Sequence, residues 1–230
     1  MANRGTPPGL EYLTMVDQLL IHQKAEILEA LTGFETSNKY VIKNSLGQQI
    51  YYAVEDTDCC TRNICGRKRP FDMKILDNAQ NEVIHLYRPL RCTMCCFPCC
   101  LQKIVVEAPP GQVVGYVSQC WYLCYPHFTV KDSQQNPFFK INGPLCQCSM
   151  CGDVEYKINT FDGAVHVGQI NKQWSGVLKE QFTDADNFSI SFPLNLDVTM
   201  KAVLLGAVFL LDYMFFEKGT DENQGLLQRM

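Results

Sequence analysis

A single long apolar block near the C-terminus limits the folds open to this chain. Residues 200–218 read MKAVLLGAVFLLDYMFFEK, and residues 202–211 within them carry no charge. A helix needs about 20 apolar residues to cross a bilayer, whereas runs of roughly 10 to 14 are more often buried core helices. Asp212 interrupts the block, and a carboxylate there has to lie near an interface, pair with a partner or face protein. The pattern favours a helix enclosed by the rest of the fold, with a membrane-spanning helix as the alternative.

The residues before this block alternate between apolar and polar in short runs, which is the period of β-strands. Phe71, Met73 and Ile75 alternate with polar residues, and Asp162-Gly163 is typical of tight hairpin turns. The runs interpreted as strands are residues 40–43, 49–54, 71–75, 83–87, 102–107, 113–118, 128–131, 138–141, 154–159, 165–169 and 188–194. A series of about eleven or twelve strands predicts a sandwich or a barrel, and a barrel of that size needs something to fill its lumen. We therefore expect a mainly β fold, a closed antiparallel barrel of about twelve strands around the C-terminal helix.

Further segments complete the predicted organisation. Between residues 10 and 31, apolar residues recur near helical spacing, which predicts an N-terminal amphipathic helix. Residues 1–9 are expected to form a short disordered arm, and residues 219–230 a polar tail. No linker interrupts the chain between them, so residues 10–218 are expected to form one domain.

Composition and motifs exclude several classes of protein. The chain has 230 residues, of which 47% are apolar and 19% charged, as in a globular protein with a sizeable core. The formal net charge of −4 provides no global attraction for nucleic acid, which is not an expected partner. The sequence has no phosphate-binding glycine loop, no G-x-S-x-G motif and no histidine pair at metal-ligand spacing. We therefore expect no enzymatic bond chemistry.

Thirteen cysteines, an odd number without an N-terminal signal segment, indicate a reducing cytosolic setting. The densest group is Cys95, Cys96, Cys99 and Cys100, which surround a Phe-Pro pair. One interpretation is a metal site, because two of these residues have C-x-x-C spacing and residues 148–151 repeat it. Adjacent cysteines project in different directions, however, and cannot all face one ion. Such a loop suits thioacylation, in which two lipid chains hold a protein firmly on a bilayer.

Basic residues near these cysteines favour thioacylation. Each basic side chain beside a lipidated thiol attracts an anionic leaflet by roughly 1 kcal/mol. The basic residues concerned are Arg88, Arg91 and Lys103 beside the cysteine loop, and Arg62, Arg67, Lys68 and Arg69 near Cys65. The alternative is that these residues form solvated loops.

Four stretches together resemble one protein family. They are RCTMCCFPCCLQ at residues 91–102, GQINKQWSG at 168–176, FTDADNFSISFPLNLD at 182–197 and the terminal apolar block. Jointly they are similar to the phospholipid scramblases, a calcium-responsive, ATP-independent family with a tubby-like fold, over almost the whole chain. The resemblance implies a twelve-stranded barrel around a C-terminal helix, palmitate on the four clustered cysteines, a calcium site before the helix and a nonclassical nuclear import segment.

The resemblance places the calcium ligands on Asp184, Asp186, Phe188, Ile190 and Asn195. Phe188 and Ile190 could offer only backbone carbonyls. Asn195 stands where the family has a carboxylate, which weakens the grip on a hard cation. We therefore expect weak calcium binding, toward the millimolar end of known sites. These residues also alternate like a strand, so the alternative is a turn followed by an edge strand.

The segment that resembles a nuclear import signal is diluted. Its one basic residue is Lys172, and Trp174 follows two residues later. An acidic groove recognises a segment with so few positive charges only weakly, so nuclear entry is not favoured. Relatives usually carry a long Pro-rich N-terminal arm, of which only Pro7 and Pro8 are present here. Docking to SH3 or WW domains is therefore not expected.

Two hypotheses for function follow. In the first, the chain is attached to the plasma membrane with its bulk in the cytoplasm, and it speeds calcium-dependent, ATP-independent, bidirectional phospholipid movement. One short helix supplies no groove for a headgroup, so this activity needs a homo-oligomer of spanning helices or a barrel surface that distorts the leaflet. In the second, a palmitoylated barrel is a peripheral lipid-binding or adaptor module that moves no lipid, with a nuclear cofactor in the unlipidated state as a further alternative. Contact between residues 202–216 and acyl chains separates the two.

Overall fold

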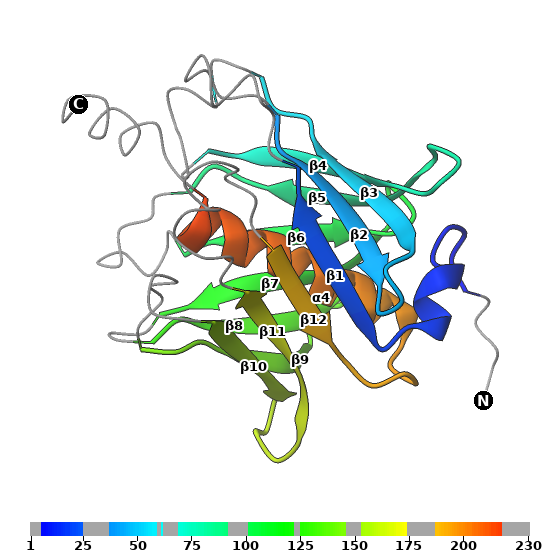
Figure 1. Cartoon of the computed structure of the whole chain (residues 1–230). Helices are drawn as coiled ribbons and strands as arrows, with labels where there is room; N and C mark the ends of the chain where they lie inside the picture. The colour runs from blue at the N-terminus through cyan, green and yellow to red at the C-terminus, as the bar shows by residue number, and fades with distance from the viewer. Residues whose placement is uncertain are drawn as a thin grey trace, which may run out of the picture.

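The computed structural model describes residues 6–24, 37–58, 61, 69–91, 101–121, 125–145, 153–173 and 187–217. Within these residues the fold is mainly β, and twelve antiparallel strands form a closed barrel around a C-terminal helix, as the sequence predicted (Figure 1). The strands are β1 (Gln18–Gln23), β2 (Lys39–Asn44), β3 (Gln49–Glu55), β4 (Phe71–Leu76), β5 (Glu82–Arg88), β6 (Lys103–Glu107), β7 (Val113–Cys120), β8 (His127–Asp132), β9 (Pro137–Asn142), β10 (Val154–Thr160), β11 (His166–Gln173) and β12 (Asn187–Ser191).

The barrel closes where the first strand pairs with the last. Each strand pairs antiparallel with its neighbour in the sequence, and β1 then pairs with β12. Leu19 of β1 faces Ile190 of β12, and Ile21 faces Phe188, with all four side chains buried. Successive side chains of a strand point to opposite faces, so the alternation in the sequence becomes an alternation between lumen and outer surface. Closure leaves no unpaired edge of the sheet.

A helix fills the lumen of the barrel. α4 (Val198–Leu211) continues into η5 (Asp212–Phe216), a short π-helix. Every residue of 200–211 is buried, as expected for a helix that is apolar on all sides. Asp197 caps the first turn, because its carboxylate accepts a 2.8 Å hydrogen bond from the Thr199 amide. The expectation of a helix enclosed by the strands is confirmed.

Two glycines let the helix lie close to the strands. On β7, a Cβ atom at Gly115 would stand 2.5 Å from the Lys131 carbonyl oxygen and 2.6 Å from Val203 Cγ2 of α4. On α4, a Cβ atom at Gly206 would stand 2.7 Å from Val106 Cγ2 of β6. Both sites are too narrow for a side chain, so α4 packs directly against β6 and β7 at these positions.

Lys201 is fully buried and fixes the N-terminal end of α4. Its Nζ donates three hydrogen bonds of 2.8 Å, to the backbone carbonyls of Leu13, Val16 and Leu194. An ammonium group has three donors, and all three are used here. Burial lowers the pKa of Lys201, although the charge of Asp17 opposes this shift. The lysine therefore joins the segment before β1 to the turn after β12.

The predicted N-terminal amphipathic helix over residues 10–31 is wrong for the part that the structure describes. The chain forms a short 3-10 helix, η1 (Glu11–Met15), and then β1. Burial in β1 alternates with the period of a strand, and β1 pairs with both β2 and β12. Pairing with distant strands outweighs the local helical spacing of the apolar residues. Residues 25–31 lie outside the described residues.

The end of the predicted disordered arm lies against the barrel. The Tyr51 hydroxyl donates a 2.7 Å hydrogen bond to the Gly9 carbonyl, and the Leu10 amide donates one of 3.1 Å to the Pro7 carbonyl. These contacts hold residues 7–10 beside η1. Residues 1–5 and the predicted polar tail lie outside the described residues.

Candidate functional site at the loop-bearing end of the barrel

The order of the strands gives the barrel two different ends. At one end, which we call the turn end, strands are joined by short turns that the structure describes fully. These turns are residues 45–48, 77–81, 108–112, 133–136 and 161–165. At the other end, the loop end, the remaining strand pairs are joined and α4 finishes. In Figure 1, η1 marks the turn end and the red end of the helix marks the loop end.

The segments of the sequence that contain cysteines connect strands at the loop end. Cys120 is the last residue of β7, and the others lie in the segments that join β3 to β4, β5 to β6, β7 to β8 and β9 to β10. Cys95, Cys96, Cys99 and Cys100, for which palmitate is predicted, lie outside the described residues. Their segment starts at the end of β5 and finishes at the start of β6, so both of its ends belong to this rim.

Hydrogen bonds close the base of this cysteine segment. Arg91 Nη1 donates to the Leu101 carbonyl at 3.0 Å, and Gln102 Nε2 donates to the Arg91 carbonyl at 3.2 Å. Gln102 Oε1 accepts hydrogen bonds from Arg88 Nε and Nη2 at 3.0 and 2.8 Å. Arg88 is fully buried, and burial lowers its pKa to about 10. Arg88 therefore supports the segment from inside, and the expectation that it attracts an anionic leaflet is wrong.

A cluster of charged side chains is buried at the same end. The Glu55 carboxylate accepts hydrogen bonds from Arg69 Nε at 2.7 Å and from Arg69 Nη2 at 3.0 Å. Arg69 Nη2 also donates to Glu217 Oε1 at 2.5 Å. The Arg69 side chain is 2% exposed, so its expected place in an exposed basic run is wrong. One guanidinium instead joins the end of β3 to the residue that follows the π-helix.

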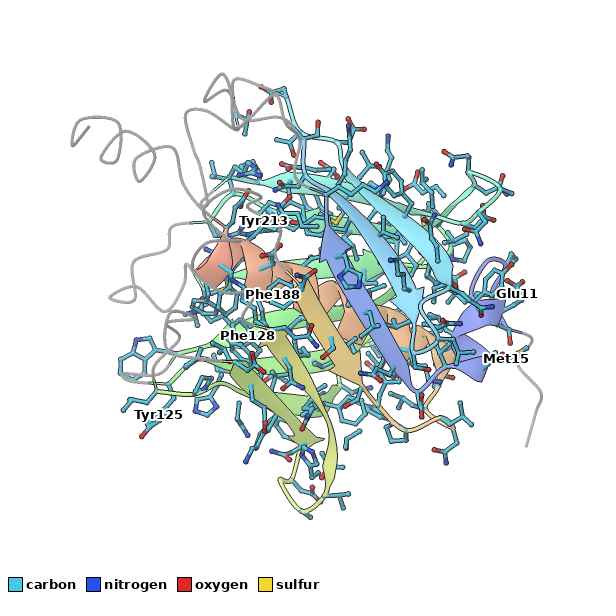
Figure 2. The ribbon with its side chains drawn as sticks, in the orientation of Figure 1. Glu11, Met15, Tyr125, Phe128, Phe188 and Tyr213 are labelled. Atoms are coloured by element: carbon cyan, nitrogen blue, oxygen red, sulfur yellow. The ribbon has the colours of Figure 1, made fainter. Side chains whose placement is uncertain are left out.

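Tyr213 and Asn38 complete the cluster. The Tyr213 hydroxyl donates to Glu55 Oε2 at 2.8 Å. Asn38 Nδ2 donates to Glu217 Oε1 at 2.8 Å and to the Tyr213 oxygen at 3.1 Å. The Arg69 guanidinium carbon lies 4.9 Å from the centroid of the Tyr213 ring. Figure 2 shows Tyr213 near the loop-end terminus of the helix, far from Glu11 and Met15 of η1.

The two carboxylates of the cluster differ in pKa. Burial would raise the pKa of Glu55, but the hydrogen bonds and charge of Arg69 outweigh burial and lower it. Burial raises the pKa of Glu217 to about 7, and Arg69 opposes this shift only in part. Oε2 of Glu217 is buried without a hydrogen-bond partner among the described residues. Glu55 therefore stays ionised near neutral pH, whereas Glu217 exchanges a proton there.

Three of the five predicted calcium residues are described, and they do not lie in one loop. Phe188 and Ile190 belong to β12, with their side chains buried in the lumen. β12 pairs with β1 on one side and β11 on the other, so the backbone carbonyls of both residues belong to the sheet. Asn195 lies beyond the other end of β12, in a turn-end pocket that Gln112 and Ser133 also line.

The length of β12 separates the two halves of the predicted calcium segment. Asp184 and Asp186 lie outside the described residues, and they precede Asn187, which begins β12 at the loop end. A strand rises about 3.3 Å per residue, so β12 places Ser191 roughly 13 Å from Asn187. Asp197, the carboxylate two residues after Asn195, caps α4 at the turn end. Among the described residues, Phe188, Ile190 and Asn195 therefore do not form one cation loop. The described part of the chain has no group of three or more His, Cys, Asp or Glu that could hold a metal.

Lys172, from the segment that resembles an import signal, is held inside the barrel. It lies in β11 and is 4% exposed. Its Nζ stands 4.6 Å from the centroid of the Phe216 ring, so its charge faces the end of the helix. Trp174 lies outside the described residues. In this conformation Lys172 is not presented to an importing partner.

Sequence reasoning missed the buried cluster. Its members are Asn38, Glu55, Arg69, Tyr213 and Glu217, which come from four separate parts of the sequence. No short motif joins them, because barrel closure and the position of the helix bring them together. The available signal was the presence of ionisable residues at the end of an otherwise apolar block.

The fold and the site define a class of protein. Among the described residues, one helix, Val198–Phe216, is long and apolar enough to span a bilayer, but 78% of its most apolar window is buried. Within the described residues, the chain is thus a helix-filled antiparallel barrel with a buried charged cluster at its loop end. No solved structure shows significant similarity to it.

Comparison with known sequences then places the chain in a family. A family model described as Scramblase matches residues 1–218. Phospholipid scramblase 1 of Mus musculus is 60% identical over 218 residues, which cover 95% of this chain and 66% of the relative. Phospholipid scramblase 2 of Bos taurus is 62% identical over 92% of this chain and 72% of its own length. Phospholipid scramblase 4 of Homo sapiens is 42% identical over 97% of this chain and 68% of its own length. The chain belongs to the scramblase family.

The chain is shorter than these relatives. It spans 66% of the length of scramblase 1 from Mus musculus and 65% of that from Rattus norvegicus, just under two thirds in each case. The aligned part contains the whole barrel and α4, because the family match extends to residue 218.

Proposed function

We propose that this chain attaches to a membrane through its loop end and speeds phospholipid movement between leaflets without ATP. The observation that carries this proposal is the family match over residues 1–218. Relatives that align over 92% to 97% of the chain are named phospholipid scramblases. Membership of this family favours lipid translocation over bond-making catalysis, and it favours association with membranes.

The filled barrel limits the route that a lipid can take. Residues 200–211 of α4 are buried against the strands and occupy the lumen. A phospholipid crossing a bilayer needs a polar route for its headgroup while its tails stay in apolar surroundings. An apolar lumen that already holds a helix offers no such route. We therefore propose that the outer surface of the barrel distorts the leaflet to which it is attached, so that headgroups cross beside the protein.

Attachment is proposed to depend on the cysteine segment. Palmitate on Cys95, Cys96, Cys99 and Cys100 would anchor the loop end, since two acyl chains hold a protein stably on a bilayer. The proposed location is the cytoplasmic face of the plasma membrane, and several copies acting together would enlarge the distorted area. Weak calcium binding remains a prediction from the resemblance, and no step above depends on it.

Lipid flipping by the purified chain tests this function. The full chain is reconstituted into phosphatidylcholine vesicles that contain a fluorescent phospholipid, and an impermeant reductant bleaches the outer leaflet. We expect bleaching to extend to inner-leaflet lipid faster than in protein-free vesicles, with and without ATP. Wild type and a variant with the four clustered cysteines changed to serine are both treated with an acyl donor before reconstitution. The variant lacks these acylation sites, so we expect it to bind fewer vesicles and to flip less phospholipid than wild type. Flipping at the protein-free rate by membrane-bound wild type would contradict the proposal.

A second candidate function is a palmitoylated adaptor that moves no lipid, and the burial of α4 favours it. Residues 202–211 are all buried, and the apolar side chains among them are 0% to 1% exposed, so the helix of this conformation cannot touch acyl chains. Phospholipids with a photoactivatable group in the acyl chain separate the possibilities when adducts are mapped by mass spectrometry. Adducts on α4 would mean that the helix leaves the barrel. Flipping without α4 adducts supports transport by the barrel surface, and binding without flipping supports the adaptor.

A further inference from the structure

Four large apolar side chains are exposed on one part of the loop end. Leu90 is 64% exposed, Trp121 52%, Tyr125 46% and Leu145 65%. They adjoin the ends of β5, β7, β8 and β9, and we call them the rim patch. Figure 2 shows Tyr125 at the edge of the molecule, on the side opposite Glu11 and Met15. Exposed apolar residues that cluster on one surface usually mark a site of interaction.

The strand register places the members of the rim patch beside one another. Cys120, which precedes Trp121, faces His127 of β8, and His127 faces Asn142 of β9. The Gly143 amide then donates a 2.9 Å hydrogen bond to the Pro126 carbonyl. Trp121, Tyr125 and Leu145 are therefore within one or two residues of positions that are paired across neighbouring strands.

The same register connects Leu90 to the others. The Gln119 amide donates a 2.7 Å hydrogen bond to the Gln102 carbonyl, so β7 lies beside the chain that returns from the cysteine segment. Arg91, next to Leu90, is hydrogen-bonded to Leu101 and Gln102. The rim patch thus follows a continuous arc of the rim from β5 to β9.

The charge around the rim patch is positive. The arc consists of residues 88–91, 101–103, 119–121, 125–128 and 143–145, which contain no Asp or Glu. Arg88 is buried, so the basic side chains that this arc offers to a membrane are those of Arg91 and Lys103. Lys103 lies over Tyr116, with Nζ 4.1 Å from the ring centroid. Partly exposed basic residues next to apolar side chains favour an anionic surface.

The turn end also exposes apolar residues but differs in charge. Leu46 is 81% and Leu194 57% exposed. Asp77, Asp132 and Asp162 lie in or beside its turns. Their pKa values are lowered chiefly by hydrogen bonds from the Asn81 amide to Asp77, from the Asn136 side chain to Asp132 and from the Thr160 hydroxyl to Asp162, so all three stay ionised. An anionic leaflet repels such an end. Apolar exposure and positive charge coincide at the rim patch.

We propose that the rim patch inserts into the interfacial layer of an anionic bilayer, which makes it a protein-encoded membrane contact in addition to acylation. Trp and Tyr prefer the headgroup region, where the ring is partly buried and the polar atom stays hydrated. Leu90 and Leu145 reach the first methylenes of the acyl chains. The proposal rests on the proposed function only for the choice of end, because the cysteine segment leaves the same arc after Arg91 and returns at Leu101.

Tryptophan fluorescence of the full, unacylated chain tests insertion directly. The chain has two tryptophans, so Trp174→Phe leaves Trp121 as the sole reporter. With vesicles of phosphatidylcholine and phosphatidylserine in a ratio of about 3 to 1, we expect Trp121 emission to shift to shorter wavelengths. Lipids brominated near the headgroup should quench it. Unchanged emission on vesicle-bound protein would overturn the proposal and would indicate that the rim patch serves another partner.

Vesicle partitioning of matched surface variants provides the second arm. Burying one Leu-sized side chain changes a partition constant by roughly tenfold or more. The double variant Trp121→Ser/Leu145→Ser is expected to bind these vesicles at least about tenfold more weakly than wild type. The control Leu46→Ser/Leu194→Ser, with two exposed turn-end residues replaced, is expected to bind like wild type. The proposal would be overturned if both variants lost vesicle binding to the same extent, or if neither variant lost any.

The outcomes also distinguish this inference from the proposed function. If Trp121 enters the bilayer but wild type flips no lipid, the contact stands and the transport proposal fails. If wild type flips lipid while Trp121 stays in water, transport stands and the rim patch is not the contact.

Discussion

Tyr40 of β2 donates a 2.6 Å hydrogen bond from its hydroxyl to Oδ2 of Asp212, the carboxylate that interrupts the apolar C-terminal block. Both residues are 1% exposed, and the Tyr40 ring also packs 5.1 Å from that of Phe209. Burial raises the pKa of Tyr40 well above its usual value, so the hydroxyl stays protonated and remains a donor. The charge that argued against a membrane span is thus accommodated inside the barrel.

Removing this donor is expected to destabilise the protein. Tyr40→Phe keeps the ring and deletes the hydroxyl, which leaves Asp212 with one hydrogen bond fewer in a buried position. Removing one partner of a buried hydrogen-bond acceptor costs about 1 to 3 kcal/mol. Urea unfolding should therefore show a lower free energy of unfolding than wild type. Tyr87→Phe, at a 43% exposed tyrosine, is the matched control and should change stability little. Equal stability of both variants would mean that the hydrogen bond contributes nothing.

Lys201 offers a second stability test, at the opposite end of α4. Lys201→Met retains most of the apolar stem but removes the ammonium that joins three backbone carbonyls. We expect the free energy of unfolding to fall by about 3 kcal/mol, because buried carbonyls lose their donors. Lys157→Met is the control, since that side chain is 64% exposed and surface substitutions usually change stability by less than about 0.5 kcal/mol. A similar small effect at both positions would remove Lys201 as the anchor of the helix.

The buried Glu217 predicts a pH-dependent loosening of the C-terminal turn. Its pKa is about 7 in the folded protein and 4.5 in the reference state, so the folded state binds the proton more tightly. The resulting stabilisation is fully present below pH 4.5, decreases as pH rises toward 7, and is absent above about pH 7. Its upper size is about 3 kcal/mol for this pKa difference.

Hydrogen exchange can measure this effect at the end of the helix. Amides of residues 212–217 should exchange faster relative to those of 202–208 at pH 8 than at pH 6, after correction for the intrinsic rate. Glu217→Gln mimics the protonated form and should abolish the difference. Persistence of the pH dependence in the Gln variant would assign it to another group.

The position of Asn195 leads to a prediction about calcium. Because the whole length of β12 separates Asn187 from position 195, we do not expect a carboxylate at position 195 to complete a cation site at the loop end. Titration calorimetry should therefore give the same weak calcium affinity for wild type and Asn195→Asp. An affinity increase of about tenfold or more in the variant would show that the two halves of the segment meet around one ion.

The sequence was sufficient to predict the barrel and its enclosed helix, because both follow from local patterns. Alternation marked each strand, and an apolar run of limited length that contained Asp212 favoured a core helix. The N-terminal helix was wrong because the apolar spacing in β1 is compatible with both periods, and only pairing with β12, far away in the sequence, decides between them. Local pattern does not contain that information.

The candidate site was predictable only in part. The cysteines were visible in the sequence, but only the order of all twelve strands shows that the segments containing them connect strands at one end. Arg69 and Arg88 looked like surface cations because nothing nearby in the sequence reveals their partners. Arg69 donates hydrogen bonds to Glu55 and Glu217, and Arg88 donates to Gln102, and only the tertiary structure brings these residues together.

Closure of the barrel by β1 and β12 has a consequence for biosynthesis. A ribosome makes β1 first, yet its outer partner and the helix that fills the lumen are both translated near the end of the chain. Until then the nascent protein is an open, curved sheet with an exposed apolar inner face and two unpaired edge strands. Such a state is prone to aggregation. Newly made chains should therefore depend on holding chaperones for most of their synthesis, and premature termination before Val198 should yield an insoluble product rather than a smaller folded one.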